Sequence, residues 1–121
     1  MKEIEKTVYE KAVFALCKLA SVKWPLQLVG KKIAFIVNYG GAEVKIYDAI
    51  NRVVISKEAD GSGFASLCLN YVDPSGNQRA LRYVSDEKKW EYCQVKANRD
   101  GDGVKVESIV FETKLFGLFT V

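Results

Sequence analysis

The chain of 121 residues contains no histidine. Without an imidazole, the sequence excludes Ser-His-Asp and Cys-His catalysis, histidine-ligated metal sites and histidine proton shuttles. Chemistry would have to depend on carboxylates, lysine, tyrosine or cysteine, and no acid–base pair, metal-ligand set or phosphate-binding loop is recognisable among them. We therefore expect a protein that is not an enzyme and that uses no cofactor and no metal.

Cysteine is also scarce, and no two of the three cysteines form a CxxC pair. This odd number argues against a disulfide framework or a zinc site. Because Cys17, Cys68 and Cys93 have apolar neighbours, we expect them to be buried free thiols in a reducing compartment. No signal peptide and no apolar run of membrane-spanning length is present, which predicts a cytoplasmic protein.

An excess of one charge is missing as well. The formal net charge is +3, from 18 basic and 15 acidic residues, which is too small to indicate a nucleic-acid partner from bulk electrostatics. The apolar fraction of 49% and the charged fraction of 27% are typical of folded globular proteins. The length suits one domain, so we predict a single α+β domain over residues 1–121.

Residues 2 to about 21 have the apolar spacing of an amphipathic helix. The apolar stripe recurs at spacings of three and four and comprises Ile4, Val8, Ala12, Val13, Leu16, Cys17, Leu19 and Ala20. Pro25 disfavours helical geometry at Trp24, so we expect it to set the end of the helix. The polar face mixes both charge signs and is not lysine-rich, so we expect no membrane contact.

After Gly30 the apolar pattern changes to the period of two that strands have. Residues 32–39 and 42–49 flank Gly40 and Gly41, a pair that favours a two-residue hairpin turn. This turn predicts three cross-strand pairs on one apolar face: Tyr39 with Ala42, Val37 with Val44, and Phe35 with Ile46. Residues 53–55 form either a third strand or part of a short bend.

A second hairpin joins residues 64–72 to 79–85 through the loop 73–77. Proline and glycine in this loop suit a type I turn followed by a bulge, which pairs Asp73 with Asn77. The same register predicts three further pairs: Tyr71 with Arg79, Leu69 with Leu81, and Leu67 with Tyr83. The opposite face should see water or a ligand and carries Ser66, Cys68, Asn70, Ala80 and Arg82.

The last hairpin joins residues 90–98 to 104–112. A turn at Asp100 and Gly101 predicts the pairs Trp90 with Phe111, Tyr92 with Ile109, Val95 with Val106, and Ala97 with Val104. A turn at Asp102 and Gly103 would change these partners but not which residues share a face. The first two pairs then lie on the opposite face from the last two. Either a bulge near Ser108 switches the faces, or the tip of the hairpin packs on another surface. The apolar residues 114–121 are expected to form a final strand.

These elements predict an N-terminal amphipathic helix packed on a curved antiparallel sheet of about six to seven strands built from hairpins. The plan is similar to that of cystatin-like and NTF2-like domains. The inhibitory hairpin motif of cystatins is not recognisable, because residues 94–98 lack its closing glycine.

Arginines beside aromatic residues could stack on bases or bind an acidic partner. The candidate binding residues are Asn70, Arg79, Arg82, Tyr83, Trp90 and Tyr92. Arg79 and Arg82 have opposite strand parity and should not share a face. The last hairpin and the C-terminal residues have more apolar side chains than one helix can cover. This surplus predicts a homo-oligomer interface at Val95, Val106, Phe116, Leu118 and Phe119.

The sequence favours a small binding protein that acts through protein–protein contacts, such as an accessory or inhibitor protein of bacterial or phage type. Its partner would be another protein or a second copy of itself. One alternative is a small-molecule or nucleotide pocket between helix and sheet, with Tyr83, Trp90 and Tyr92 as walls. Another is single-stranded nucleic acid bound on the face that carries Asn70 and Arg82.

Overall fold

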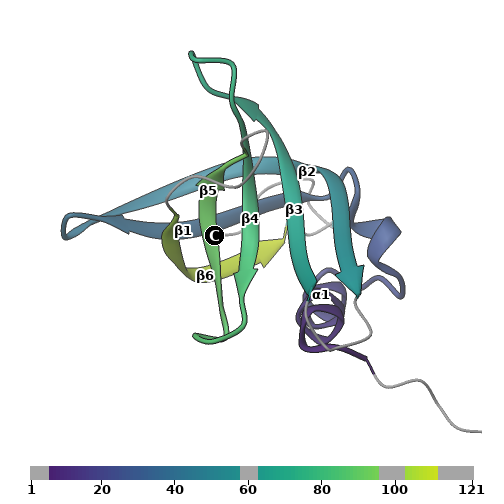
Figure 1. Cartoon of the computed structure of the whole chain (residues 1–121). Coiled ribbons are helices and arrows are strands. Elements are labelled where there is room, and N and C mark those ends of the chain that lie inside the picture. Colours follow the sequence, from purple (N-terminus) through teal and green to yellow (C-terminus); the bar gives the residue numbers. More distant parts are fainter. Residues whose placement is uncertain (1–5, 58–62, 96–102, 112–121) are drawn as a thin grey trace, which may run out of the picture.

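The computed structural model describes residues 6–57, 63–95 and 103–111. This part of the chain contains one α-helix, one short 3₁₀-helix and six strands (Figure 1). The elements in chain order are α1 (Val8–Leu19), η1 (Pro25–Leu28), β1 (Lys32–Tyr39), β2 (Ala42–Lys57), β3 (Gly63–Val72), β4 (Gln78–Val84), β5 (Lys89–Gln94) and β6 (Val104–Phe111).

The six strands follow one another in sequence order and close into an antiparallel barrel. The predicted α+β plan with an antiparallel sheet of hairpins is confirmed, but the sheet predicted to be curved is a closed barrel. Closure occurs because β6 pairs with β5 only at its start and then runs along β1. This arrangement gives both outer strands of the meander a partner, which removes the exposed edges that an open sheet would have.

The first hairpin has the predicted register, with Tyr39 opposite Ala42 and Phe35 opposite Ile46. Gly40 and Gly41 have φ angles of 57° and 91°, as a type I′ turn requires. Residues 53–55 belong to β2, which continues past the hairpin to pair with β3. A one-residue bulge at Asn51 bends β2 between these two partners.

The second hairpin has the predicted loop but not the predicted register. The Asp73 N–H donates to the Asn77 carbonyl at 2.9 Å, as expected for the three-residue loop. However, Leu67 pairs with Leu81 and not with Tyr83, because two extra residues of β3 lie between Cys68 and Val72. The Gln78 Nε2 amide donates to the Leu69 carbonyl at 2.9 Å and so satisfies a backbone group within this bulge.

The pairs predicted for the last hairpin are wrong, because most of β6 pairs with β1. Tyr92 lies opposite Val104, whereas Ile109 and Phe111 lie opposite Phe35 and Ile33. The predicted bulge near Ser108 is confirmed: Ser108 pairs with Ile36 and Val106 with Val37, which leaves one extra residue on β6. The bulge turns both Val106 and Ile109 toward the core. The strand predicted for residues 114–121 lies outside the described residues.

The helix is shorter than predicted and begins with a capping box. The Thr7 Oγ1 accepts the Glu10 N–H at 3.1 Å, and the Glu10 carboxylate accepts the Thr7 N–H at 3.0 Å. The helix ends at Leu19, two residues before Ser21, which has a φ of 58°. Pro25 therefore does not end α1; it starts η1, where its fixed φ suits the first turn.

The buried face of α1 is formed by Val13, Leu16, Cys17 and Ala20. Val8 and Leu19, which were predicted to belong to this face, are exposed because they lie at the two ends of the helix. Tyr9 ties the helix to the end of β4, with its hydroxyl 3.3 Å from Ser85 Oγ and its ring edge-on to Tyr83.

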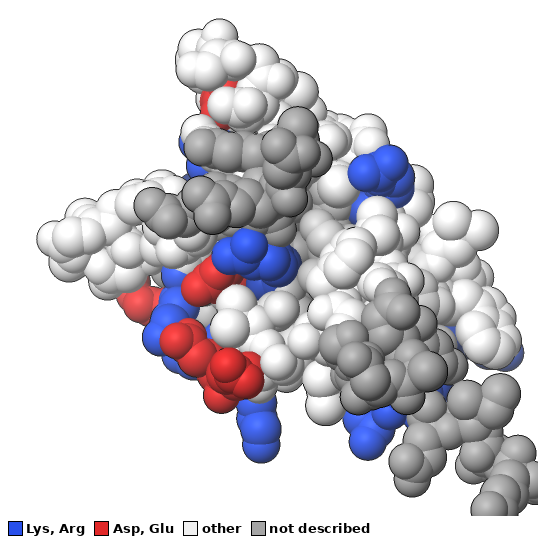
Figure 2. Space-filling view, in the orientation of Figure 1, with Lys and Arg blue, Asp and Glu red and all other residues white. Residues whose placement is uncertain are grey.

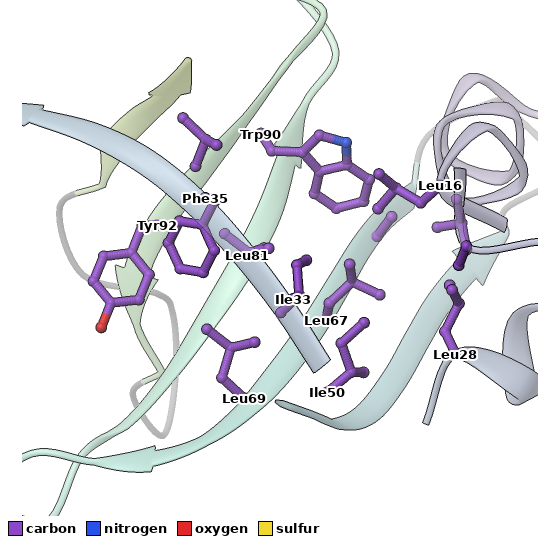
Figure 3. Close-up of a cluster of buried hydrophobic side chains, with 14 of the residues drawn as sticks. Leu16, Leu28, Ile33, Phe35, Ile50, Leu67, Leu69, Leu81, Trp90 and Tyr92 are labelled. Atoms are coloured by element: carbon purple, nitrogen blue, oxygen red, sulfur yellow. The ribbon is translucent and has the colours of Figure 1, made fainter. Parts of the chain in front are cut away.

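The core of the barrel extends from α1 to the far end of the strands (Figure 3). Leu16 and Leu28 lie at the helix end of this cluster, and Tyr92 lies at the other end. The largest fully buried side chains between them are Ile33, Phe35, Val37, Ile50, Leu67, Leu69 and Leu81. The region where α1 meets the barrel is therefore packed with core side chains.

The three cysteines are buried and free, as predicted. Cys68 and Ala80 were expected on a face that sees water, but they are buried. The Arg52 side chain helps to shield Cys68 from water, with its Nη2 3.9 Å from the Cys68 Sγ. No helix in the described residues is long and apolar enough to cross a membrane.

Closure of the barrel through β6 can be tested by a pair of substitutions on this strand. Val106 is 6% exposed and Val110 is 39% exposed. We expect Val106→Asp to lower the free energy of unfolding by about 3 kcal/mol, because it buries an unpaired charge. Val110→Asp should change it by less than about 1 kcal/mol. Equal losses in chemical denaturation would contradict the closed barrel.

Candidate functional site

A notch opens in the barrel wall where β2 and β3 stop pairing. Their last pair is Ile50 with Leu69, beyond which the two hairpins diverge in different directions (Figure 1). The notch has a volume of about 420 Å³. Three strands supply its lining residues: Ile46, Tyr47, Asp48, Asn70, Tyr71 and Tyr92. Its volume lies within the range of pockets that bind small molecules.

The side chain of Asp48 holds the two strands at the point where they separate. Its carboxylate accepts the backbone N–H of Tyr71 at 3.0 Å and that of Ala49 at 2.7 Å. Beside it, the Asn51 Nδ2 donates to the Asn70 Oδ1 at 3.0 Å. These side-chain bonds replace the strand ladder at the notch, so the notch is a defined part of the fold.

Tyr92 forms the inner wall of the notch. It is 7% exposed, and its ring packs against Phe35 with 5.2 Å between the ring centroids. The hydroxyl points away from the core (Figure 3), and it makes no hydrogen bond to any residue that the structure describes. Because the hydroxyl faces the notch, a ligand that enters can form a hydrogen bond with it.

The hydroxyl of Tyr92 stays neutral over the physiological pH range. Burial raises its pKa to about 12, and the nearby guanidinium of Arg79 opposes part of that rise. Tyr39, Asp48 and Tyr71 make smaller contributions to the same rise in the pKa. The neutral hydroxyl can both donate and accept one hydrogen bond in the notch.

Arg79 lies over the Tyr92 ring, with 5.4 Å from its guanidinium carbon to the ring centroid. Asp73 balances its charge through a contact of 3.5 Å between Nη2 and Oδ2. Gln94 donates to the same carboxylate oxygen at 3.1 Å. Arg79 and Asp73 lie outside the lining of the notch. Among the six residues that line it, Asp48 is the one that carries a charge.

The structure brings only part of the predicted binding set to the notch. Asn70 and Tyr92 line it, and Arg79 is adjacent. Tyr83 and Trp90 pack against each other with 5.2 Å between centroids, at the inner face of the barrel. Arg82 lies apart from these residues and pairs with Glu91 at 2.9 Å, and its side chain does not share a face with Arg79, as predicted.

The residues predicted to form an oligomer interface are not gathered on one described surface. Val106 lies in the core, so the barrel itself accounts for its apolar character. The Val95 N–H continues the β4–β5 ladder by donating to the Gln78 carbonyl at 2.8 Å. Phe116, Leu118 and Phe119 lie outside the described residues.

Sequence reasoning missed Asp48 and Tyr71. A signal for Asp48 was present, because the predicted hairpin register already places it opposite Ile33, on the apolar face shared with Ile46. A carboxylate on such a face requires an explanation. No comparable signal marks Tyr71, which reaches the notch through the bulge in β3.

No protein-family model, curated protein or solved structure matches the chain. Within residues 6–57, 63–95 and 103–111, no group of three or more histidine, cysteine, aspartate or glutamate residues could hold a metal ion. A function must therefore be argued from the geometry of the notch.

The turn next to the notch should be sensitive to acid. The N–H groups of Asn77 and Ser75 bond the Asp73 carboxylate and, with Gln94 and Arg79, hold its pKa below the ordinary value although burial opposes this. The folded state then loses stability as the pH falls below about 4, because protons bind the unfolded chain more tightly.

We expect Asp73→Asn to reduce this loss in denaturant titrations at several acidic pH values. Asp86→Asn, in the exposed turn between β4 and β5, is the matched control. The pH dependence of the control should equal that of the wild type. If Asp73→Asn keeps the full acid dependence, the Asp73 network does not stabilise the turn.

Proposed function

We propose that this chain is a non-enzymatic binding protein that holds an organic cation, an ammonium or guanidinium group, in the notch. The observation that carries this proposal is the lining of the notch, where the largely buried Tyr92 and the negatively charged Asp48 lie beside two exposed tyrosines. A ligand in the notch can replace the water around the Tyr92 hydroxyl with a direct hydrogen bond.

Charge and aromatic surface favour a cation as the ligand. Asp48 supplies the one charge of the lining, and it is negative. Tyr47 and Tyr71 are about half exposed at the rim, which makes their rings accessible from solvent. Tyrosine rings attract cations through their negative faces, by about 0.5–2 kcal/mol per contact. A carboxylate beside several tyrosines therefore suits an ammonium or guanidinium group.

Two sources could supply such a group: a free metabolite, or a lysine or arginine side chain of a partner protein. Both fit the expectation of a binding protein. A pocket between helix and sheet is less suitable, because Leu16, Leu67 and Trp90 pack there. Single-stranded nucleic acid is also less suitable, because the charge of the notch repels phosphates and Arg82 is paired with Glu91.

The proposal is tested by calorimetry with choline and with its neutral isostere, 3,3-dimethylbutan-1-ol. We expect choline to bind and the alcohol to bind at least tenfold more weakly, about 1.4 kcal/mol. Asp48→Asn should weaken choline binding by about tenfold as well. Glu43→Gln, an equal charge change at an exposed position of the same strand, should leave binding unchanged.

Thermal unfolding of both variants checks that they remain folded. A comparison of choline with N-acetyl-lysine methylamide and N-acetyl-arginine methylamide distinguishes a free ligand from a protein side chain as the preferred source. The proposal fails if none of these cations binds at millimolar concentration, or if the neutral alcohol binds as tightly as choline.

A further inference from the structure

The end of the molecule opposite the notch has a surface that the notch does not explain. Between the end of α1 and the start of β1, several large apolar side chains are exposed. Trp24 is 62% exposed and Leu26, in η1, is 79% exposed. Leu19 and Val29 add to this group. An exposed group of this kind indicates an interaction surface.

Lysines lie around Phe14, the aromatic neighbour of Trp24. The ring of Trp24 meets the ring of Phe14 edge-on at 6.4 Å, and the Lys6 Nζ lies 4.5 Å from the centre of the Phe14 ring. Lys11 and Lys18 are three residues before and four residues after Phe14, so they flank it on the same face of α1. We call this the Trp24 surface: Lys6, Lys11, Phe14, Lys18, Lys23, Trp24 and Leu26.

The charge of this region is strongly one-sided. Residues 6–32 contain six lysines and one acidic residue, Glu10. The Glu10 carboxylate is held in the capping box with Thr7. On the face shown in Figure 2, the charged side chains visible next to α1 are basic. The expected polar face of mixed charge included two acidic residues: Glu3, which precedes the start of α1 at Val8, and Glu10.

We propose that the Trp24 surface binds the surface of an anionic lipid bilayer, independently of the notch. Trp24 and Leu26 would enter the interfacial region while the surrounding lysines contact anionic headgroups. Exposed apolar side chains that are grouped, as Trp24 and Leu26 are, can be buried in a deformable apolar medium or in a matching pocket. A bilayer provides both the deformable apolar medium and the negative charge. A nucleic acid would satisfy the lysines but leave Leu26 in water.

The chain contains a natural probe for this proposal. Of its two tryptophans, Trp24 is 62% exposed and Trp90 is 9% exposed in the core. Vesicles of phosphatidylcholine with phosphatidylserine should shift the emission of the full-length protein to shorter wavelength. Trp24→Phe, which leaves only the buried Trp90, should abolish the shift. Vesicles of phosphatidylcholine alone should give little binding in co-sedimentation.

Charge variants test the role of the lysines. One lysine near an anionic surface contributes about fivefold to partitioning. We therefore expect the double variant Lys18→Gln, Lys23→Gln to lower the vesicle partition coefficient by about 25-fold. The same charge change at Lys45 and Lys89, which are exposed on β2 and β5, should have a much smaller effect. Leu26→Ser should also weaken binding without changing its salt dependence.

Four results would overturn the proposal. The first is no binding to the anionic vesicles at low salt, and the second is equal binding to both vesicle types. The third is retention on a single-stranded oligonucleotide without any vesicle binding, which would assign the lysines to a polyanion. The fourth is a blue shift of Trp24 that depends on protein concentration without vesicles, which would assign the surface to a second copy of the chain.

Discussion

The pairing of β1 with β6 is the constraint on which the rest of the structure depends. It gives β1 a neighbour on both sides and turns a meander of hairpins into a closed barrel. The bulge in β6 makes this pairing compatible with burial, because it directs apolar side chains from both halves of the strand to the core. One end of the resulting core is covered by α1, and Tyr92 forms the other end. The closed barrel therefore has two different ends: α1 covers one, and Tyr92 lines the notch at the other.

The notch follows from a mismatch of strand lengths. β2 has 16 residues, whereas β1 has 8 and β3 has 10. The first half of β2 therefore pairs with β1, and its second half pairs with β3. The bulges in β2 and β3 lie next to the last shared pair, and the strands separate there. Asp48 stabilises this separation by bonding the backbone of Tyr71. The same carboxylate gives the notch its negative charge, so one residue connects the architecture with the proposed ligand.

Local chemistry explains which parts of this fold could be predicted. The Gly40–Gly41 turn and the loop after Asp73 depend on neighbouring residues, and both were predicted correctly. The capping box of Thr7 and Glu10 has the recognisable sequence pattern Thr-x-x-Glu, but it was not predicted. The register predicted beyond the loop was wrong because β3 has a bulge, in which the Gln78 side chain bonds the Leu69 carbonyl. The closure of the barrel was not predicted, because it pairs β1 with β6, and these two strands lie far apart in the sequence. Asn70 and Tyr92 were expected to bind, but the bulges that bring them together left no signal in a single sequence.

The central claim is that the Tyr92 hydroxyl faces the notch and is left for a ligand, without a partner among the described residues. The free energy of unfolding of Tyr92→Phe, measured in denaturant without any added ligand, tests this most directly. Because the substitution removes a polar group that has no partner, the account predicts a free energy equal to or above that of the wild type. A loss of about 1 kcal/mol or more would contradict it, because the hydroxyl would then have a hydrogen-bond partner within the free protein.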